Sequence, residues 1–154
     1  MTNLGGKKKI QPDAFSLANF PKGALGRHIL AEFWECNPER LDDCTHIEQT
    51  MLDAARRAEA TIITHSFHQF APQGVSGAVI IAESHLSIHT WPELGYAAVD
   101  LFTCGKELAG EAALTTLRDG LEAGTVSVLR IPRGIPEAIH AEGSRRVRLA
   151  WQKS

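Results

Sequence analysis

Apolar residues alternate with polar ones along much of this chain, which predicts β-strands. Successive side chains of a strand point to opposite faces, so a strand that is covered on one side only has this period of two. The alternating runs are rich in Val, Ile and aromatic residues and are bounded by Gly, Pro, Asn or Asp, as is typical of strands. The strands are predicted over residues 27–36, 61–70, 74–81, 87–91, 96–104 and 125–131.

Two helix starts are predicted between the first and second of these strands. Asn37 is a favourable N-cap residue, and Pro38 follows it at the first helical position. Residues 45–60 then begin with Thr45 and Glu48 at the spacing of a capping box. Apolar residues recur on one face of this segment, which predicts an amphipathic helix. That face consists of Ile47, Met51, Ala54, Ala55 and Ala58.

Another helix is predicted within residues 106–124, where leucines recur at positions i, i+3 and i+7. Gly120 lies inside this segment, and glycine is unfavourable in a helix interior because it loses the most backbone entropy. The pattern still favours a helix that buries one side. The leucines are Leu114, Leu117 and Leu121.

The order of the elements predicts an α+β fold. We expect a two-layer sandwich, with a mainly antiparallel sheet and two helices packed on one face. A chain of 154 residues with 44% apolar content suits one domain. We place the domain at residues 25–133, between a flexible arm at 1–24, rich in Lys, Gly and Pro, and a polar tail at 134–154.

The charge of the chain gives no argument for nucleic acid or an anionic membrane as a partner. The formal net charge is −2, with both signs mixed along the sequence. No apolar run approaches the length of about 18 residues needed to span a membrane. The three cysteines lack CxxC spacing, so reduced thiols and a cytoplasmic location are expected.

Candidate chemistry lies where a β-forming run is interrupted by Glu83, Ser84 and His85, with His89 shortly after. A metal bound by both histidines is not predicted, because four residues of a strand span about 13 Å. A hydrolase could use Ser84, His89 and Glu83 or Glu93, but no GxSxG motif is present. Cys104 with a histidine is another possible nucleophile. These residues could equally be the polar residues of a loop and a partly exposed strand.

Three ordered motifs resemble a known family. "ESHLSIHTWPE" at residues 83–93, "GVSG" at 74–77 and "YAAVDLFTCG" at 96–105 resemble the signature of the pyruvoyl-dependent S-adenosylmethionine decarboxylases of the short prokaryotic type. "LGRHILAEFWEC" at 25–36 resembles the start of that family. The resemblance is close up to residue 105 and looser up to about residue 133. The arm and the tail depart from the compact short form.

The resemblance implies a proenzyme that cuts itself between Glu83 and Ser84, giving a β chain of residues 1–83 and an α chain of residues 84–154. Ser84 would become a covalent pyruvoyl cofactor that forms a Schiff base with the substrate, so neither pyridoxal phosphate nor a metal is expected. His89 corresponds to the processing base, Ser76 to a serine that assists the acyl shift, and Cys104 to the proton donor.

The resemblance also implies S-adenosylmethionine as the small-molecule substrate and its decarboxylated form, an aminopropyl donor for spermidine synthesis, as the product. Phe70 corresponds to an aromatic residue that contacts the nucleoside, and Glu93 to the carboxylate that binds both ribose hydroxyls. Trp91 and Leu25 are further candidates for the pocket wall; aromatic faces suit a sulfonium cation. Members of the family are homodimers of cleaved protomers, with sites that use residues of both.

Two other functions stay open. The same scaffold could decarboxylate arginine or ornithine, in which case only the pocket would differ. An unprocessed paralogue could be a regulatory subunit, although Ser76, Ser84 and His89 are all present. Activation by putrescine belongs to the larger eukaryotic form, and nothing in this sequence argues for it.

Overall fold

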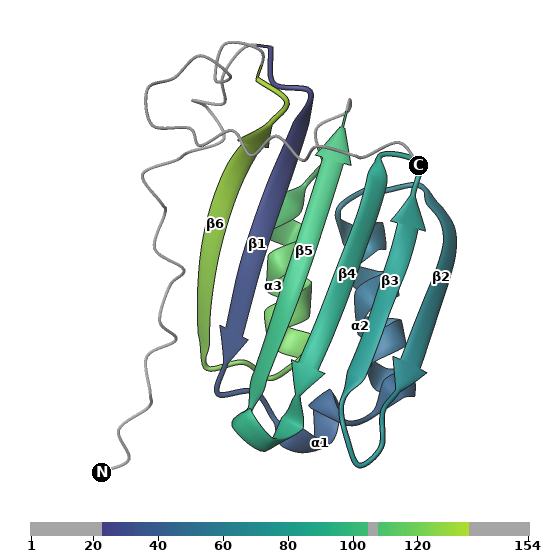
Figure 1. Ribbon diagram of the computed structural model, residues 1–154, viewed down its shortest axis with the longest axis vertical. Helices are drawn as coiled ribbons and strands as arrows, with labels where there is room; N and C mark the ends of the chain where they lie inside the picture. Colours follow the sequence, from purple (N-terminus) through teal and green to yellow (C-terminus); the bar gives the residue numbers. More distant parts are fainter. Residues whose placement is uncertain (1–22, 105–107, 136–154) are drawn as a thin grey trace, which may run out of the picture.

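A six-stranded sheet, antiparallel at every pairing, forms one layer of the protein in the order β2-β3-β4-β5-β1-β6. The computed structural model describes residues 23–104 and 108–135. Nearly all of the predicted arm and tail therefore lies outside the described residues. The elements, drawn in Figure 1, are β1 (Gly26–Trp34), α1 (Pro38–Leu41), α2 (Cys44–Arg57), β2 (Ile62–Gln69), β3 (Val75–Ile81), β4 (Ser84–Trp91), the 3-10 turn η2 (Pro92–Leu94), β5 (Tyr96–Cys104), α3 (Gly110–Gly120) and β6 (Thr125–Arg133).

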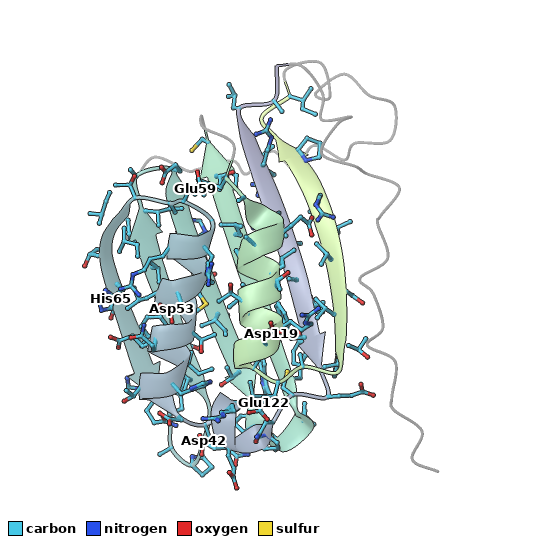
Figure 2. All side chains as sticks on the ribbon, turned by 180° about the vertical axis from the view of Figure 1, so that it is seen from behind. Asp42, Asp53, Glu59, His65, Asp119 and Glu122 are labelled. Atoms are coloured by element: carbon cyan, nitrogen blue, oxygen red, sulfur yellow. The ribbon has the colours of Figure 1, made fainter. Side chains whose placement is uncertain are left out.

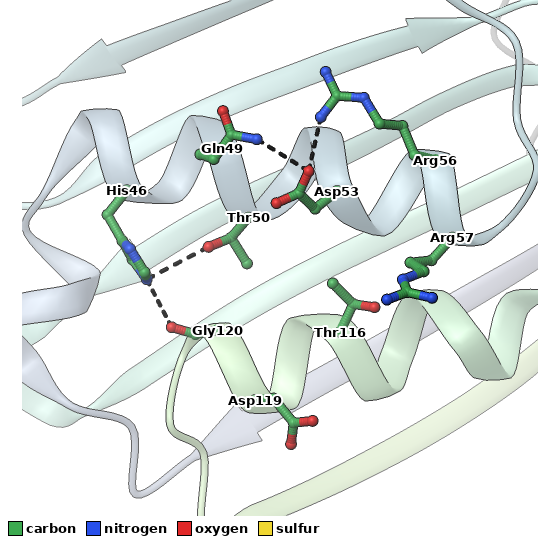
Figure 3. A pocket seen from close by; sticks show the side chains of 9 residues that line it. All are labelled: His46, Gln49, Thr50, Asp53, Arg56, Arg57, Thr116, Asp119 and Gly120. Carbon is green, nitrogen blue, oxygen red and sulfur yellow. Dashed lines mark hydrogen bonds and ion pairs between the residues drawn. The ribbon is translucent and has the colours of Figure 1, made fainter.

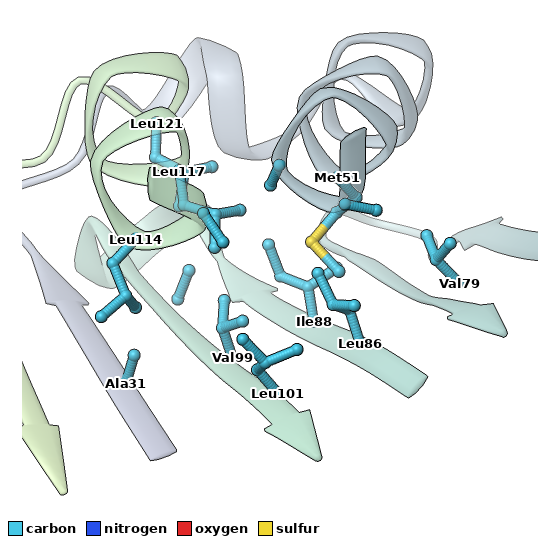
Figure 4. Packing of buried hydrophobic residues seen from close by; sticks show 14 of the residues in the cluster. Ala31, Met51, Val79, Leu86, Ile88, Val99, Leu101, Leu114, Leu117 and Leu121 are labelled. Carbon is cyan, nitrogen blue, oxygen red and sulfur yellow. The ribbon is translucent and has the colours of Figure 1, made fainter. Parts of the chain in front are cut away.

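Helices α2 and α3 form the second layer on one face of the sheet (Figures 1 and 2). The predicted α+β sandwich is therefore confirmed. The apolar faces of both helices meet alternate residues of the central strands (Figure 4). Burying one such Leu, Ile or Met side chain stabilises the fold by about 1.5–3 kcal/mol. The buried residues include Phe33, Ile47, Met51, Val79, Leu86, Ile88, Val99, Leu101, Leu114 and Leu117.

The start of α2 differs from the prediction. Its N-cap is Asp43, whose carboxylate accepts a hydrogen bond from the amide of His46 at 3.0 Å, so the predicted capping box at Thr45 is wrong. The amide of Cys44, the first residue of the helix, donates to the side-chain oxygen of Gln69 at 3.1 Å. Because both early amides find partners here, the helix begins before Thr45. The predicted N-cap at Asn37 is confirmed, since its side chain accepts from the amide of Glu39.

Gly120 is explained by the close approach of the two long helices. A Cβ atom at this position would lie 2.5 Å from Cγ2 of Thr50 on α2, closer than any two carbon atoms can pack. The carbonyl oxygen of Gly120 also contacts Nε2 of His46 at 2.7 Å. The glycine that weakens the helix pattern is therefore required by the contact between the helices. None of the helices in residues 23–104 and 108–135 is both long and apolar enough to cross a membrane.

The face of the sheet opposite α2 and α3 carries no other described element (Figure 1). Its outward residues are a mixture of polar groups and large apolar side chains. Several large apolar side chains exposed on one face of a sheet are typical of a binding surface. The large apolar residues exposed on or beside this open face are Trp34, Phe70, Ile80, Trp91 and Leu129.

Candidate active site

The peptide bond between Glu83 and Ser84 lies at a strained turn. Ala82 and Glu83 form a two-residue connection between β3 and β4, in which Ile81 pairs with Ser84. Such short turns favour residues with positive φ, usually Gly or Asn. Neither Ala82 nor Glu83 has a positive φ, whereas Ser84 has a φ of 149°. This conformation is costly for any residue with a side chain, by about 1–3 kcal/mol.

The carbonyl group of Glu83 is held by Cys104. Its oxygen accepts a hydrogen bond from the amide of Cys104 at 2.8 Å and another from Sγ of Cys104 at 3.3 Å. The Glu83 carboxylate accepts from the amide of Thr61 at 3.1 Å, which fixes the side-chain end of the same residue. Donors at these distances polarise a carbonyl and can stabilise an oxyanion formed from it. The bond that precedes Ser84 is therefore both strained and activated.

Cys104 is also the most exposed of the three thiols. It ends β5 and is exposed, whereas Cys36 is buried. Burial raises the pKa of the Cys36 thiol to about 11. The pKa of the Cys44 thiol is raised as well, first by burial and then by the nearby carboxylates of Glu48 and Asp43. Both of these thiols therefore ionise less readily than a free thiol.

A second pair of candidate side chains lies farther along the same strands. Ser76 on β3 and His89 on β4 are in register, and Oγ of Ser76 lies 2.7 Å from Nδ1 of His89. His89 comes five residues after Ser84, which corresponds to about 16 Å along a strand. The imidazole in contact with the hydroxyl of Ser84 is that of His85, with Nδ1 3.3 Å from Oγ. A Ser84–His89 hydrolase pair is therefore not assembled within one chain.

The candidate residues thus form two groups at opposite ends of the strands. The first, called the turn group, is Leu25, Glu83, Ser84 and Cys104; Leu25 belongs here because it precedes Gly26, which pairs with Cys104. The second, called the strand-end group, is Phe70, Ser76, His89, Trp91 and Glu93.

Contacts within the strand-end group are mainly aromatic and polar. The ring of Phe70 meets His68 edge to face, with centroids 4.7 Å apart. The rings of His89 and Trp91 have centroids 6.4 Å apart. Glu93 accepts a hydrogen bond from Gln73 at 2.9 Å. A basic ring, exposed aromatic faces and a carboxylate are thereby gathered at one end of the sheet.

Trp91 continues into an aromatic stack on the open face. Its ring stacks on Tyr96 with centroids 5.2 Å apart, and Trp34 stacks on Tyr96 with centroids 4.2 Å apart. The hydroxyl of Tyr96 donates to the carboxylate of Glu32. Burial, together with the carboxylates of Glu32 and Asp100, raises the pKa of Tyr96 to about 12.

We expect a spectrophotometric titration to detect this shift, because Tyr96 is the only tyrosine of the chain. The folded protein should show tyrosinate absorbance with a midpoint near pH 12, and Glu32→Gln should lower that midpoint. The folded state holds the proton more tightly than the unfolded state does. The stabilisation is therefore complete below pH 10 and is lost as the pH rises from 10 through 12. A midpoint near 10 in protein that circular dichroism shows to be folded would contradict the assignment.

Comparison with known proteins identifies the family. A family model described as S-adenosylmethionine decarboxylase matches residues 27–134. Proteins named S-adenosylmethionine decarboxylase proenzyme from Acidithiobacillus ferrooxidans and Thermotoga maritima are each 54% identical over 111 residues; the match covers 72% of this chain and 84% and 85% of those proteins. The crystal structure of the adenosylmethionine decarboxylase from Aquifex aeolicus VF5 has a TM-score of 0.68 and 34% identity, covering 80% of this chain and 98% of that one. The chain belongs to the S-adenosylmethionine decarboxylase family.

A polar groove between α2 and α3 is a different kind of surface (Figure 3). It has a volume of about 790 Å³, but it lies on the helix layer, away from both groups of candidate residues. Asp53 forms an ion pair with Arg56 at 2.7 Å and accepts a hydrogen bond from Gln49 at 3.0 Å. The S-adenosylmethionine decarboxylase motifs contribute no residue to it. We therefore assign the site to the strands.

Three contacts within the candidate site are absent from the sequence-based prediction. They are the backbone amide of Cys104, the anchoring of Glu83 by Thr61, and the contact of Gln73 with Glu93. The sequence contains one signal for the two contacts with Glu83. An Ala-Glu connection between two strands lacks the Gly or Asn that such a turn favours, which indicates an unusual turn at this point. The contact of Gln73 depends on the folded position of η2 and has no local signal.

Proposed function

We propose that this chain is a self-processing S-adenosylmethionine decarboxylase whose pyruvoyl group is formed from Ser84. The observation that carries the proposal is the pair of hydrogen bonds from Cys104 to the Glu83 carbonyl, next to the strained backbone of Ser84. The reaction releases carbon dioxide from S-adenosylmethionine and gives S-adenosylmethioninamine, the aminopropyl donor of spermidine synthesis.

Self-processing begins when the hydroxyl oxygen of Ser84 adds to the carbonyl carbon of Glu83. The tetrahedral oxyanion is stabilised by the amide and the thiol of Cys104. The carbon–nitrogen bond then breaks as the hydroxyl proton is transferred to the nitrogen of Ser84, which leaves an ester and a free amine and relieves the strain at Ser84. A base then removes the Cα proton of Ser84, and the Glu83 carboxylate leaves by β-elimination. Water hydrolyses the resulting dehydroalanine, and ammonia is released.

The residues around position 84 suit a pyruvoyl group, because the thiol of Cys104 lies beside this position, 3.3 Å from the carbonyl oxygen of Glu83. A pyruvoyl group supplies a ketone that condenses with the substrate amine and accepts electrons as carbon dioxide leaves. The thiol of Cys104 holds the proton that replaces the carboxylate at the substrate Cα. Phe70 and Trp91 offer their faces to the nucleoside and the sulfonium, and Glu93 accepts hydrogen bonds from the ribose hydroxyls.

A homodimer completes the site. Within one chain, His89 lies about 16 Å from Ser84, which is too far for proton transfer. In a dimer with two-fold symmetry, the open faces of two sheets can stack so that the turn group of one protomer meets the strand-end group of the other. His89 and Ser76 of one protomer then act on Ser84 of its partner.

The size and composition of the open face support this dimer. Six strands about 4.8 Å apart and about nine residues long give a face of roughly 800 Å², the area that each partner contributes to a stable interface. Trp34, Ile80 and Leu129 are apolar side chains on that face. Burying them offsets part of the entropy that two chains lose on association.

The two alternatives are less well supported. The family match names S-adenosylmethionine, not arginine or ornithine. An unprocessed regulatory subunit would not need a polarised carbonyl at Glu83 or a strained Ser84. Arginine and ornithine have no ribose diol for Glu93 to bind, although a carboxylate can pair with their cationic side chains.

The intact mass of the purified protein under denaturing conditions tests the proposal. We expect two chains, residues 1–83 and 84–154, with the second lighter by one ammonia than a fragment that begins with serine. Carbon dioxide release should then be seen with S-adenosylmethionine and not with arginine or ornithine. A single uncut chain would overturn the processing, and release from another amino acid alone would overturn the substrate.

A further inference from the structure

The loop between β2 and β3 connects two residues of the strand-end group. Phe70 begins this loop, and Gln73 near its end donates from Nε2 to Oε2 of Glu93 at 2.9 Å. Both Gln73 and Glu93 are exposed. Within the described residues, Glu93 makes no other side-chain hydrogen bond or ion pair. The orientation of its carboxylate therefore depends on Gln73.

The loop itself is fixed from the helix layer by Asp42. Oδ1 of Asp42 accepts hydrogen bonds from the amide of Gly74 and from Nε2 of Gln69, both at 2.8 Å. The amide of Phe70 donates to the carbonyl of Gly74 at 2.8 Å, which closes the loop. Gly74 has a φ of 99°, a conformation that favours glycine. Asp42 lies beside α1, at the end of the molecule shown lowest in Figure 2.

The strand that leads to Glu93 is fixed by the same part of the fold. The amide of Val75 donates to Oγ1 of Thr90 at 2.8 Å, and that hydroxyl donates to the carbonyl of Leu41 at 2.8 Å. Thr90 is buried, so these bonds are shielded from water. Both partners of the Gln73–Glu93 contact are therefore presented by backbone that is tied to the end of α1.

We propose that Gln73 is a positioning residue that orients the Glu93 carboxylate for the ribose diol of the substrate. This inference rests on the proposed function. A carboxylate that accepts from two adjacent hydroxyls must present both oxygens towards the diol, and a free glutamate side chain loses rotamer entropy on doing so. The hydrogen bond from Gln73 fixes Oε2 and leaves Oε1 and a second lone pair of Oε2 for the hydroxyls. Gln73 thereby contributes to selectivity for a ribonucleoside.

The test compares S-adenosylmethionine with its 2′-deoxy analogue in wild-type protein and in Gln73→Leu. Loss of the amide donor should raise KM for S-adenosylmethionine about three- to tenfold, the range expected for freeing one ordered side chain. KM for the 2′-deoxy analogue should change much less, and kcat should stay within about twofold for both. Self-cleavage and melting temperature should be unchanged because Gln73 is exposed.

The matched control is Gln49→Leu, the same change at an exposed glutamine on α2 that contacts Asp53. It should leave both KM values unchanged. If Gln73→Leu leaves the ratio of the two KM values at the wild-type level, or raises both equally, Gln73 does not position Glu93. A wild-type chain that does not decarboxylate S-adenosylmethionine overturns the proposed function and this inference with it. An active wild type with an unchanged ratio in the variant overturns this inference alone.

Discussion

Ser84→Ala is expected to leave the whole protein as one uncut chain without decarboxylase activity. Alanine has no hydroxyl to add to the Glu83 carbonyl, so the acyl shift cannot begin, and no other group can become the ketone. The strain at position 84 and the hydrogen bonds from Cys104 remain, which means that strain alone does not cut the chain. Denaturing mass spectrometry measures the cleavage, and carbon dioxide release measures the activity.

The matched control is Ser127→Ala, which removes the hydroxyl of another strand serine, on β6. This variant should be cut fully and should be active. Loss of activity in both variants, or full cleavage of Ser84→Ala, would contradict the role given to Ser84. A fall of several degrees in the melting temperature of Ser84→Ala alone would show that its hydroxyl also stabilises the fold.

Two inactive variants are expected to restore processing when they share a dimer. His89→Ala should stay uncut because the base that removes the Cα proton is missing. Ser84→Ala keeps His89 but has no serine to process. In a mixed dimer, His89 of the Ser84→Ala chain faces Ser84 of the His89→Ala chain, so the latter should be cut. Coexpression with two different affinity tags isolates this dimer, and the mass of an 84–154 fragment that carries His89→Ala reports the result.

Coexpression of His89→Ala with a second tagged copy of itself is the control and should give uncut chains only. If the purified mixed dimer also contains only uncut chains, His89 does not act across the interface and the shared site is wrong. If no mixed dimer can be isolated while the wild type is a monomer in solution, the proposed dimer is wrong. Cleavage of only about half of the His89→Ala chains would indicate that some of them are not paired with a Ser84→Ala chain. The ratio of the two affinity tags in the sample would show this.

Most of the fold could be predicted from local pattern. The apolar face of α2 is buried as expected, and the N-cap at Asn37 lies where the sequence places it. The start of α2 was predicted wrongly because two capping signals overlap, one at Asp43 and one at Thr45. The choice between them depends on Gln69, which is 25 residues away from Cys44 and reaches its amide only in the folded protein.

For the site, the motifs named the residues but not their arrangement. Ser84, His89 and Cys104 lie within 21 residues of one another, yet the fold brings Cys104 to Glu83 and leaves His89 at the other end of the strand. The separation of His89 from Ser84 can be predicted from strand geometry, since each residue adds about 3.3 Å. The contact of Cys104 with Glu83 follows only from the register of β4 with β5, which no local pattern encodes.

The sequence by itself determined the identity of the elements, the apolar faces and the family, because periodicity and motifs are written in consecutive residues. Only the tertiary structure decided which groups touch. The hydrogen bonds from Cys104 to Glu83, from Thr61 to Glu83 and from Gln73 to Glu93 join residues distant in sequence, and such contacts depend on how strands pair and pack. The division of the site between two ends of the sheet has the same origin. Strand pairing fixes each side chain to one face and one position along the sheet. The separation of Ser84 and His89 along β4 therefore cannot be closed within a single chain.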